Sequence, residues 1–141
     1  MTAIRDERAA NVRRLQPLRV LLSGRDRRFI RVMSFLLTRR GYEVSQASPE
    51  QTVGAAESHR ADVVLLETSD SRVATVRKLA ALQALPVPPS VLVVVEDEAH
   101  ERWTGLQAIP KWMPIDVLAD EIEAAALSRP GPLVERLSSQ L

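Results

Sequence analysis

Two charged side chains that directly follow predicted strands are the best placed to do chemistry. Glu67 ends the apolar run 63–66, and Lys111 follows the short apolar stretch 108–110. Because the carboxyl ends of parallel strands meet at one edge of a sheet, where α/β sheets bind ligands, we expect both side chains at that edge. A partly buried charge needs a partner, so the sequence predicts an ion pair of Glu67 with Lys111, with Arg25, or with both. The alternative is a solvated Glu67 without a regulatory role.

Other catalytic constellations are missing from the sequence. His59 and His100 have no second ligand at metal-binding spacing, and the chain has no cysteine. Its five glycines are scattered and form no loop of the kind that cradles a phosphate. Ser23, Ser45 and Ser48 have no histidine or lysine placed to activate them. The sequence therefore predicts no enzymatic activity, no cofactor and no metal site.

Apolar and amphipathic stretches alternate along the chain, as in a parallel sheet covered by helices on both faces. We expect strands at 18–23, 42–47, 62–67, 91–95 and 108–110. We expect helices at 26–40, after a capping Ser48, at 72–84, at 97–106 and at 114–127. The first of these helices has an apolar face made of Phe29, Val32, Met33, Leu36 and Leu37, and Gly41 ends it. The predicted fold is α/β, with a doubly wound, five-stranded parallel sheet.

A single domain of ordinary size accounts for most of the 141 residues, of which 45% are hydrophobic. We expect a basic N-terminal arm at 1–16, the domain at 17–128, and a C-terminal tail at 129–141. No apolar run approaches the roughly 20 residues of a membrane span, and cysteine is absent. A cytoplasmic location is the resulting expectation.

Charge is distributed unevenly along the chain. Residues 1–40 hold eleven arginines against three acidic residues, whereas residues 41–141 hold eight basic and fifteen acidic residues, balances of +8 and −7. A basic sector can attract nucleic acid or an acidic protein surface. Arginines also occupy the solvated side of ordinary amphipathic helices, however, so nucleic acid is the less favoured partner.

Four segments of the chain carry a resemblance to a known family. They are RVLLSGRD (19–26), RRGYEV (39–44), ADVVLLE (61–67) and IPKWMPIDVLADEI (109–122). In order and spacing they resemble the receiver domain of bacterial response regulators, over about residues 17–128. The resemblance implies a flavodoxin-like three-layer sandwich and a place in two-component signal transduction. In that family a phosphorylated aspartate stands at the position of Glu67.

The resemblance also shows what this chain has lost from the phosphorylation site. The acidic pair that holds magnesium falls on Gly24 and Arg25, with Asp26 in the next place. The hydroxyl residue at the end of the fourth strand falls on Val95. Magnesium requires hard oxygen ligands, and without the metal phosphoryl transfer loses its main charge neutraliser. Together with Glu67, this pattern is typical of a degenerate receiver, or pseudo-receiver.

Three further positions, 108, 111 and 112, bear on this interpretation. In the family, a hydroxyl residue and an aromatic residue couple phosphorylation to a movement of the loops. These positions fall on Val95 and Ala108, so both groups are missing here. The family's lysine is retained as Lys111. A proline normally follows that lysine in a cis bond; because Trp112 stands there instead, we expect a trans bond. Glu67 reaches further than aspartate, so it can partly mimic an acyl phosphate; a role in stability alone is the alternative.

Trp103, Trp112 and Met113 are the candidate partner face, because aromatic residues and methionine are good interface anchors. The alternative is that they pack inward. The function predicted is a signalling module that works by protein–protein interaction without phosphorylation, with a homodimer as one possible assembly. A phosphate-accepting receiver that uses Asp26 or another atypical site is the second hypothesis. A nucleic-acid-associated regulator that uses the arginine-rich N-terminal region is the third.

Overall fold

A five-stranded parallel sheet forms the centre of the molecule, as a computed structural model shows for residues 16–68, 71–96 and 108–128. The strand order is β2-β1-β3-β4-β5. The strands are β1 (Arg19–Ser23), β2 (Glu43–Ala47), β3 (Val63–Glu67), β4 (Ser90–Val95) and β5 (Ala108–Pro110). This arrangement confirms the predicted doubly wound sheet, and each predicted strand agrees with an observed one within one residue at either end.

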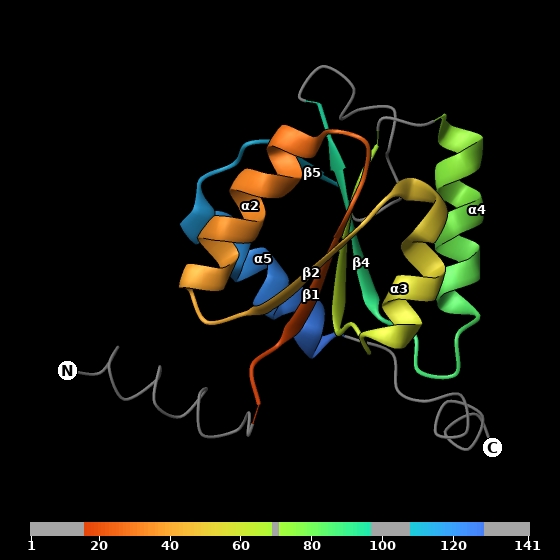
Figure 1. The fold of residues 1–141 in the computed structure, drawn as a ribbon, viewed down its shortest axis with the longest axis horizontal. Helices are drawn as coiled ribbons and strands as arrows, with labels where there is room; N and C mark the ends of the chain where they lie inside the picture. Colours follow the sequence, from red (N-terminus) through yellow and green to blue (C-terminus); the bar gives the residue numbers. More distant parts are fainter. Residues whose placement is uncertain (1–15, 69–70, 97–107, 129–141) are drawn as a thin grey trace.

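Helices cover both faces of the sheet, which gives the predicted three layers (Figure 1). α2 (Arg27–Arg39) and α5 (Ile115–Leu127) lie on one face. α3 (Thr52–Ser58), preceded by the 3₁₀ helix η1 (Pro49–Gln51), and α4 (Arg72–Gln83) lie on the other. The helix expected at 97–106, the arm before residue 16 and the tail after residue 128 lie outside the described residues. Among the described helices, none is long and apolar enough to cross a membrane.

Burial on both faces explains why the central strands are apolar without alternation. Every residue of β3 and β4 is buried, and successive side chains enter two separate cores. One core joins the sheet to α2 and α5 through residues such as Leu22, Leu65 and Ile122. The other joins it to α3 and α4 through residues such as Leu21 and Leu82. A polar residue at a strand end is therefore held between two packed layers.

The buried stripe of α2 differs by one position from the predicted one. Phe29, Ile30, Met33 and Leu37 are the buried residues, whereas Val32 is 37% exposed. The prediction that Val32 belongs to the apolar face of this helix is wrong, because Ile30 is buried against the sheet in its place. The helix ends as expected, since Gly41 adopts a left-handed backbone with φ 93° that a residue with a Cβ adopts less readily.

The start of the helical segment after β2 also differs from the prediction. Ser48 makes no side-chain capping hydrogen bond, and the chain first forms the 3₁₀ turn of η1 before α3 begins at Thr52. The Thr52 hydroxyl donates to the Pro49 carbonyl at 2.9 Å and lies 2.5 Å from the Ser23 hydroxyl. The Ser48 carbonyl takes part instead, because it accepts from the Gln51 amide at 3.0 Å.

Candidate functional site

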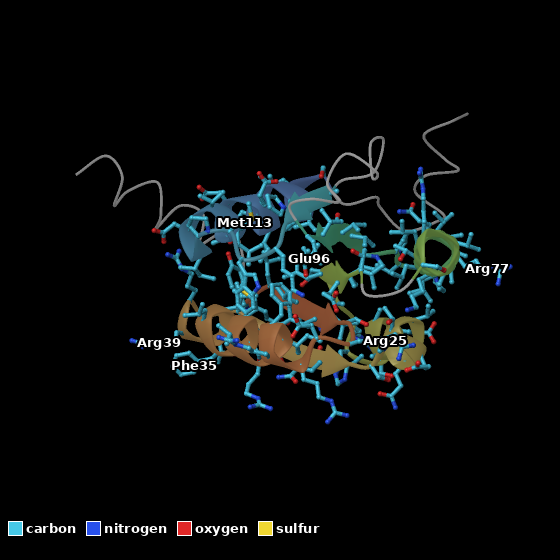
Figure 2. The ribbon with its side chains drawn as sticks, turned by 90° about the horizontal axis from the view of Figure 1, so that it is seen from above. Arg25, Phe35, Arg39, Arg77, Glu96 and Met113 are labelled. Carbon is cyan, nitrogen blue, oxygen red and sulfur yellow. The ribbon has the colours of Figure 1, made fainter. Side chains whose placement is uncertain are left out.

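The carboxyl ends of four strands bring the predicted pocket residues together. Gly24 follows β1, Glu67 ends β3, Val95 ends β4 and Lys111 follows β5. In the direction from which Figure 2 is drawn, Glu96 lies near the centre of this edge and Arg25 lies over the end of the sheet nearer α2 and α3. The structure therefore places every predicted member of the pocket at one edge, including Asp26 at the start of α2.

Glu67 folds back over the loop after β1 and does not extend into solvent. It is 7% exposed, and its Oε1 accepts hydrogen bonds from the backbone amides of Arg25 at 3.1 Å and Asp26 at 3.0 Å. A carboxylate held by backbone amides in this way is strongly stabilised, because charge-assisted hydrogen bonds are the stronger kind. The solvated alternative for Glu67 is thus wrong for this structure.

Gly24 leaves the space that the Glu67 side chain occupies. A Cβ built on Gly24 would lie 2.6 Å from the Glu67 Cβ and 2.7 Å from its Oε1. Both distances are far inside van der Waals contact, so a side chain at position 24 and the observed Glu67 cannot coexist without movement. The glycine at 24 and the glutamate at 67 are therefore sterically coupled.

Arg25 contacts this cluster in a different way from the one predicted. Its backbone amide binds Glu67, while its guanidinium pairs with Glu50 at 3.2 Å on the surface. The contact between Arg25 and Glu67 is a backbone hydrogen bond, whereas the prediction was an ion pair of the two side chains. The physical reason is that Glu67 points toward the loop amides, and the arginine side chain leaves the loop on its outer side.

Lys111 is the cation at the centre of the site and is 8% exposed. Its Nζ makes a very short ion pair with Asp26 Oδ2, a second with Glu96 Oε1 at 3.1 Å, and a longer one with Glu67 Oε2 at 3.9 Å. The predicted pair of Glu67 with Lys111 is confirmed, but it is the longest of the three. Asp26 is the main partner, and Glu96 is a member that the sequence analysis missed although it directly follows β4.

The pKa values of the central pair move in the directions that an ion pair requires. The hydrogen bond from Lys111, followed by that from the Phe29 amide, lowers the pKa of Asp26 below 3.8. Burial acts to lower the pKa of Lys111, but the hydrogen bonds to Asp26 and Glu96 and the charge of Glu67 outweigh it and raise that pKa above 10.5. Both groups are therefore charged across the neutral range.

Aromatic rings close the pocket beside the lysine. Lys111 Nζ lies 5.4 Å from the centroid of the Phe29 ring, within the range of a cation–π interaction. The Trp112 ring meets the same Phe29 edge to face at 5.2 Å. The bond between Lys111 and Trp112 is trans, as predicted, and Trp112 has a left-handed backbone with φ 63°. That conformation is rare for a bulky residue and orients the indole over Phe29.

The positions of the switch relay carry no hydroxyl or aromatic group. Val95 is fully buried, and Ala108, which pairs with Val93 from the neighbouring strand β5, is half-buried. The hydroxyl of Thr68, the residue after β3, donates to the Val94 carbonyl at 3.0 Å. A backbone hydrogen bond still connects the ends of β4 and β5, because the Lys111 amide donates to the Val95 carbonyl at 2.7 Å.

The donor set at this edge does not suit magnesium. Gly24 and Arg25 supply no carboxylate, Glu67 Oε1 already accepts two amides, and Asp26 Oδ2 binds Lys111. In the described part of the chain, no group of three or more acidic, histidine or cysteine side chains is arranged to hold a metal ion. The Lys111 ammonium lies where several carboxylates converge, so a divalent cation would have to displace it.

Of the candidate partner face, the structure describes two residues. Trp112 is 47% exposed, which leaves part of the indole available. Met113 is half-buried and packs against the core shared by the sheet, α2 and α5. Trp103 lies outside the described residues.

Comparison with known proteins supports the fold. No protein-family model and no curated protein sequence matches this chain. A response regulator receiver protein from Burkholderia phymatum is 23% identical, with a TM-score of 0.60 over 82% of this chain and 99% of that one. CheY-like receiver domains from Methanospirillum hungatei and Methylobacillus flagellatus are 18% and 14% identical, with TM-scores of 0.64 and 0.66. They cover 80% and 78% of this chain and 96% and 99% of their own.

These similarities define the class of structure. The chain has the CheY-like receiver fold, with its five parallel strands in the order β2-β1-β3-β4-β5. The predicted resemblance is therefore confirmed at the level of the fold. Sequence identities of this size carry no residue-level function, so the role of the pocket must be argued from its own geometry.

The steric coupling between positions 24 and 67 can be measured with a double-mutant cycle. We expect Gly24→Ala to destabilise the protein by about 1 to 3 kcal/mol, because its Cβ overlaps Glu67. Glu67→Gly removes both the Cβ and the Oε1 that a side chain at position 24 would meet, so the double variant should be more stable than the two single effects added together. Chemical denaturation of the four proteins gives the coupling energy. Strict additivity would contradict the contact.

The pair of Asp26 with Lys111 predicts a pH dependence of stability. Asp26→Asn keeps the helix cap but loses the charge, and should lower the free energy of unfolding by about 1 to 3 kcal/mol near pH 7. Because folding lowers the pKa of Asp26 below 3.8, the difference should persist above that pH and vanish as the pH falls further. Because folding raises the pKa of Lys111, its contribution is lost only as the pH rises above 10.5.

The control for this measurement is Glu57→Gln, a neutralised acid on the exposed side of α3. Its stability should follow that of the unmodified protein from pH 7 down to the acid transition. If Asp26→Asn and Glu57→Gln have the same profile, the Asp26 ion pair contributes nothing to the fold.

Proposed function

We propose that this protein is a pseudo-receiver: a signalling module of the two-component type that acts through protein contact and does not use phosphorylation. The observation that supports it most directly is the position of Glu67, whose carboxylate is buried over Gly24 and held by two backbone amides. The place of a phosphorylated residue is filled by a buried side chain whose Oε1 is held by two amides and whose Oε2 faces Lys111 at 3.9 Å.

Charge compensation at the site supports the same proposal. In a working receiver, metal and phosphate charges must be balanced at the moment of transfer. Here the Lys111 ammonium already lies where the carboxylates of Asp26, Glu96 and Glu67 converge, so these acids have a resident cation without an added metal. A resident cation fits a module with one resting state better than one switched by a phosphoryl group.

The missing relay further favours phosphorylation independence. A hydroxyl at the end of β4 would have to bind a phosphoryl oxygen and move, but Val95 is buried and cannot hydrogen-bond. Ala108 provides no aromatic ring to follow such a movement. We infer that any signal leaves this protein through its surface as it stands, with no catalysis by the chain.

Trp112 is the part of the surface that we assign to partner contact. Its indole is half exposed while its inner edge is fixed by Phe29, and rigid aromatic side chains are frequent interface anchors. The solved structures of similar fold are described as response regulator receivers, which is the basis for placing this chain in signalling. The partner is a protein in this proposal, and a second copy of the chain is one candidate.

Phosphorylation independence predicts no reaction with a small phosphodonor. The intact protein, incubated with acetyl phosphate and magnesium, should gain no phosphate by mass spectrometry. Its melting temperature should be the same with and without millimolar magnesium, because a ligand that does not bind the native state cannot stabilise it. Stoichiometric phosphate on Asp26 or Glu67 would overturn the proposal in favour of an atypical phosphate-accepting receiver.

A positive control can be built from the same chain. The triple variant Gly24→Asp, Arg25→Asp, Glu67→Asp supplies an acidic pair and moves away the carboxylate oxygen that lies 2.7 Å from a Cβ at position 24, while the contact with the Cβ of residue 67 needs a shift of the loop. If it folds, magnesium should raise its melting temperature by several degrees. A magnesium response in the unmodified protein as large as in the triple variant would contradict our account of the pocket.

Partner contact through Trp112 predicts a selective effect on complex formation. The full-length protein, used as bait, should retain its partner, and Trp112→Ser should weaken retention by about tenfold or more if the indole is an anchor. The matched control is Arg77→Gln, an exposed position on α4 that lies far from Met113 in Figure 2. Equal retention by all three proteins, with unchanged melting temperatures, would exclude Trp112 as the contact.

A further inference from the structure

A cleft beside the filled pocket is not used by the proposed function. It lies between the first two turns of α2 and the segment from the end of β2 through η1, with a volume of about 480 Å³. Its floor is made of Ile30, Ala47 and Pro49, all buried. Volumes of about 300 to 1,000 Å³ are typical of small-molecule sites, and such sites combine an apolar lining with a few polar groups.

Arginines give this cleft a positive charge that the described residues do not balance. Arg27 and Arg31, one turn apart on α2, both line it and are exposed. Within the described residues, neither guanidinium has an ion pair or a hydrogen bond to another side chain. Arg25 also lines the cleft, but it pairs with Glu50, so this acid is already compensated. The cleft therefore carries two cations in excess.

Neutral polar groups complete the rim. Gln46 and Ser48 are exposed at the end of β2, on the side of the cleft that faces α2. Ser48 makes no capping hydrogen bond with its side chain, so its hydroxyl is not needed by η1. An amide and a hydroxyl opposite two guanidinium groups can bind a polar ligand from both sides.

We propose that this cleft binds a small organic phosphate of nucleotide size. Arginine presents its donors as a planar fork that matches phosphate oxygens, and two such forks one helical turn apart suit a doubly charged group. The cleft is larger than a bare phosphate requires, and its apolar floor offers an area for a sugar or a ring. The proposal is binding without reaction, because no histidine or lysine lines the cleft to activate the Ser48 hydroxyl, and the Glu50 carboxylate is paired with Arg25.

The other arginines of α2 provide an internal control. Arg39 lies at the far end of the helix, where its guanidinium stacks 5.7 Å from the centroid of the exposed Phe35 ring. In Figure 2, Phe35 and Arg39 are at the opposite end of α2 from Arg25. Arg39 thus contributes to the basic surface of the same helix without lining the cleft. A variant at Arg39 therefore distinguishes binding in the cleft from general attraction of anions to the helix.

Calorimetric titration of the full chain tests the proposal with defined probes. Adenosine monophosphate and ribose 5-phosphate carry the phosphate with a body, whereas inorganic phosphate and adenosine each carry one part. We expect saturable, one-to-one binding of at least one of the first two, and binding about tenfold weaker or more for both partial probes. Arg27→Gln and Arg31→Gln should each weaken binding about tenfold or more, as the loss of a charged hydrogen bond implies.

Arg39→Gln removes the same charge outside the cleft and should change the affinity less than about twofold. All three positions are exposed, and melting temperatures confirm that the variants are folded. Saturable binding of neither organic phosphate would overturn the proposal. So would an equal loss in Arg39→Gln, or tight binding of a single-stranded oligonucleotide that depends equally on all three arginines, since either result indicates a diffuse basic surface.

Discussion

The contact between the Glu67 carboxylate and the bare backbone of Gly24 organises the carboxyl edge of this protein. Because position 24 has no side chain, the acid at the end of β3 can turn back and accept two amides from the loop that leads into α2. Those hydrogen bonds fix the loop and with it Asp26, which caps the helix through the Phe29 amide at 3.1 Å. The position of α2 on the sheet is thus linked to one carboxylate.

Lys111 can be buried only because this arrangement supplies its counter-charges. An ammonium group taken out of water is costly unless it is paired and hydrogen-bonded. Asp26 arrives from α2, Glu67 from β3 and Glu96 from the end of β4, so three separate segments converge on the lysine that follows β5. The cluster connects the strands that carry the edge, and removal of any one acid leaves the cation less compensated. This is why the site works as a unit and not as a set of independent pairs.

The sequence was sufficient to predict the fold and the approximate composition of the site. Apolar runs without alternation indicate buried parallel strands, and β5 was predicted at 108–110, where it is found. The ion pair of Glu67 with Lys111 also followed from their common position after strands. The dominance of Asp26 and the part played by Glu96 did not follow, because distances within an edge depend on how far each loop bends. For the same reason the exposure of Val32 and the left-handed backbone of Trp112 were not predictable: both depend on packing between elements.

The overlap between position 24 and Glu67 constrains how the sequence can change. A metal-binding edge would need an acid at 24, but a Cβ there meets the Glu67 Cβ at 2.6 Å and its Oε1 at 2.7 Å. Shortening residue 67 to aspartate moves the carboxylate away and gives up the two amide hydrogen bonds, but the Cβ contact stays unless the loop after β1 shifts. Replacements at the two positions are therefore coupled through the backbone of this loop as well as through the side chains. The path of the backbone thus limits which pairs of side chains this pocket can accept.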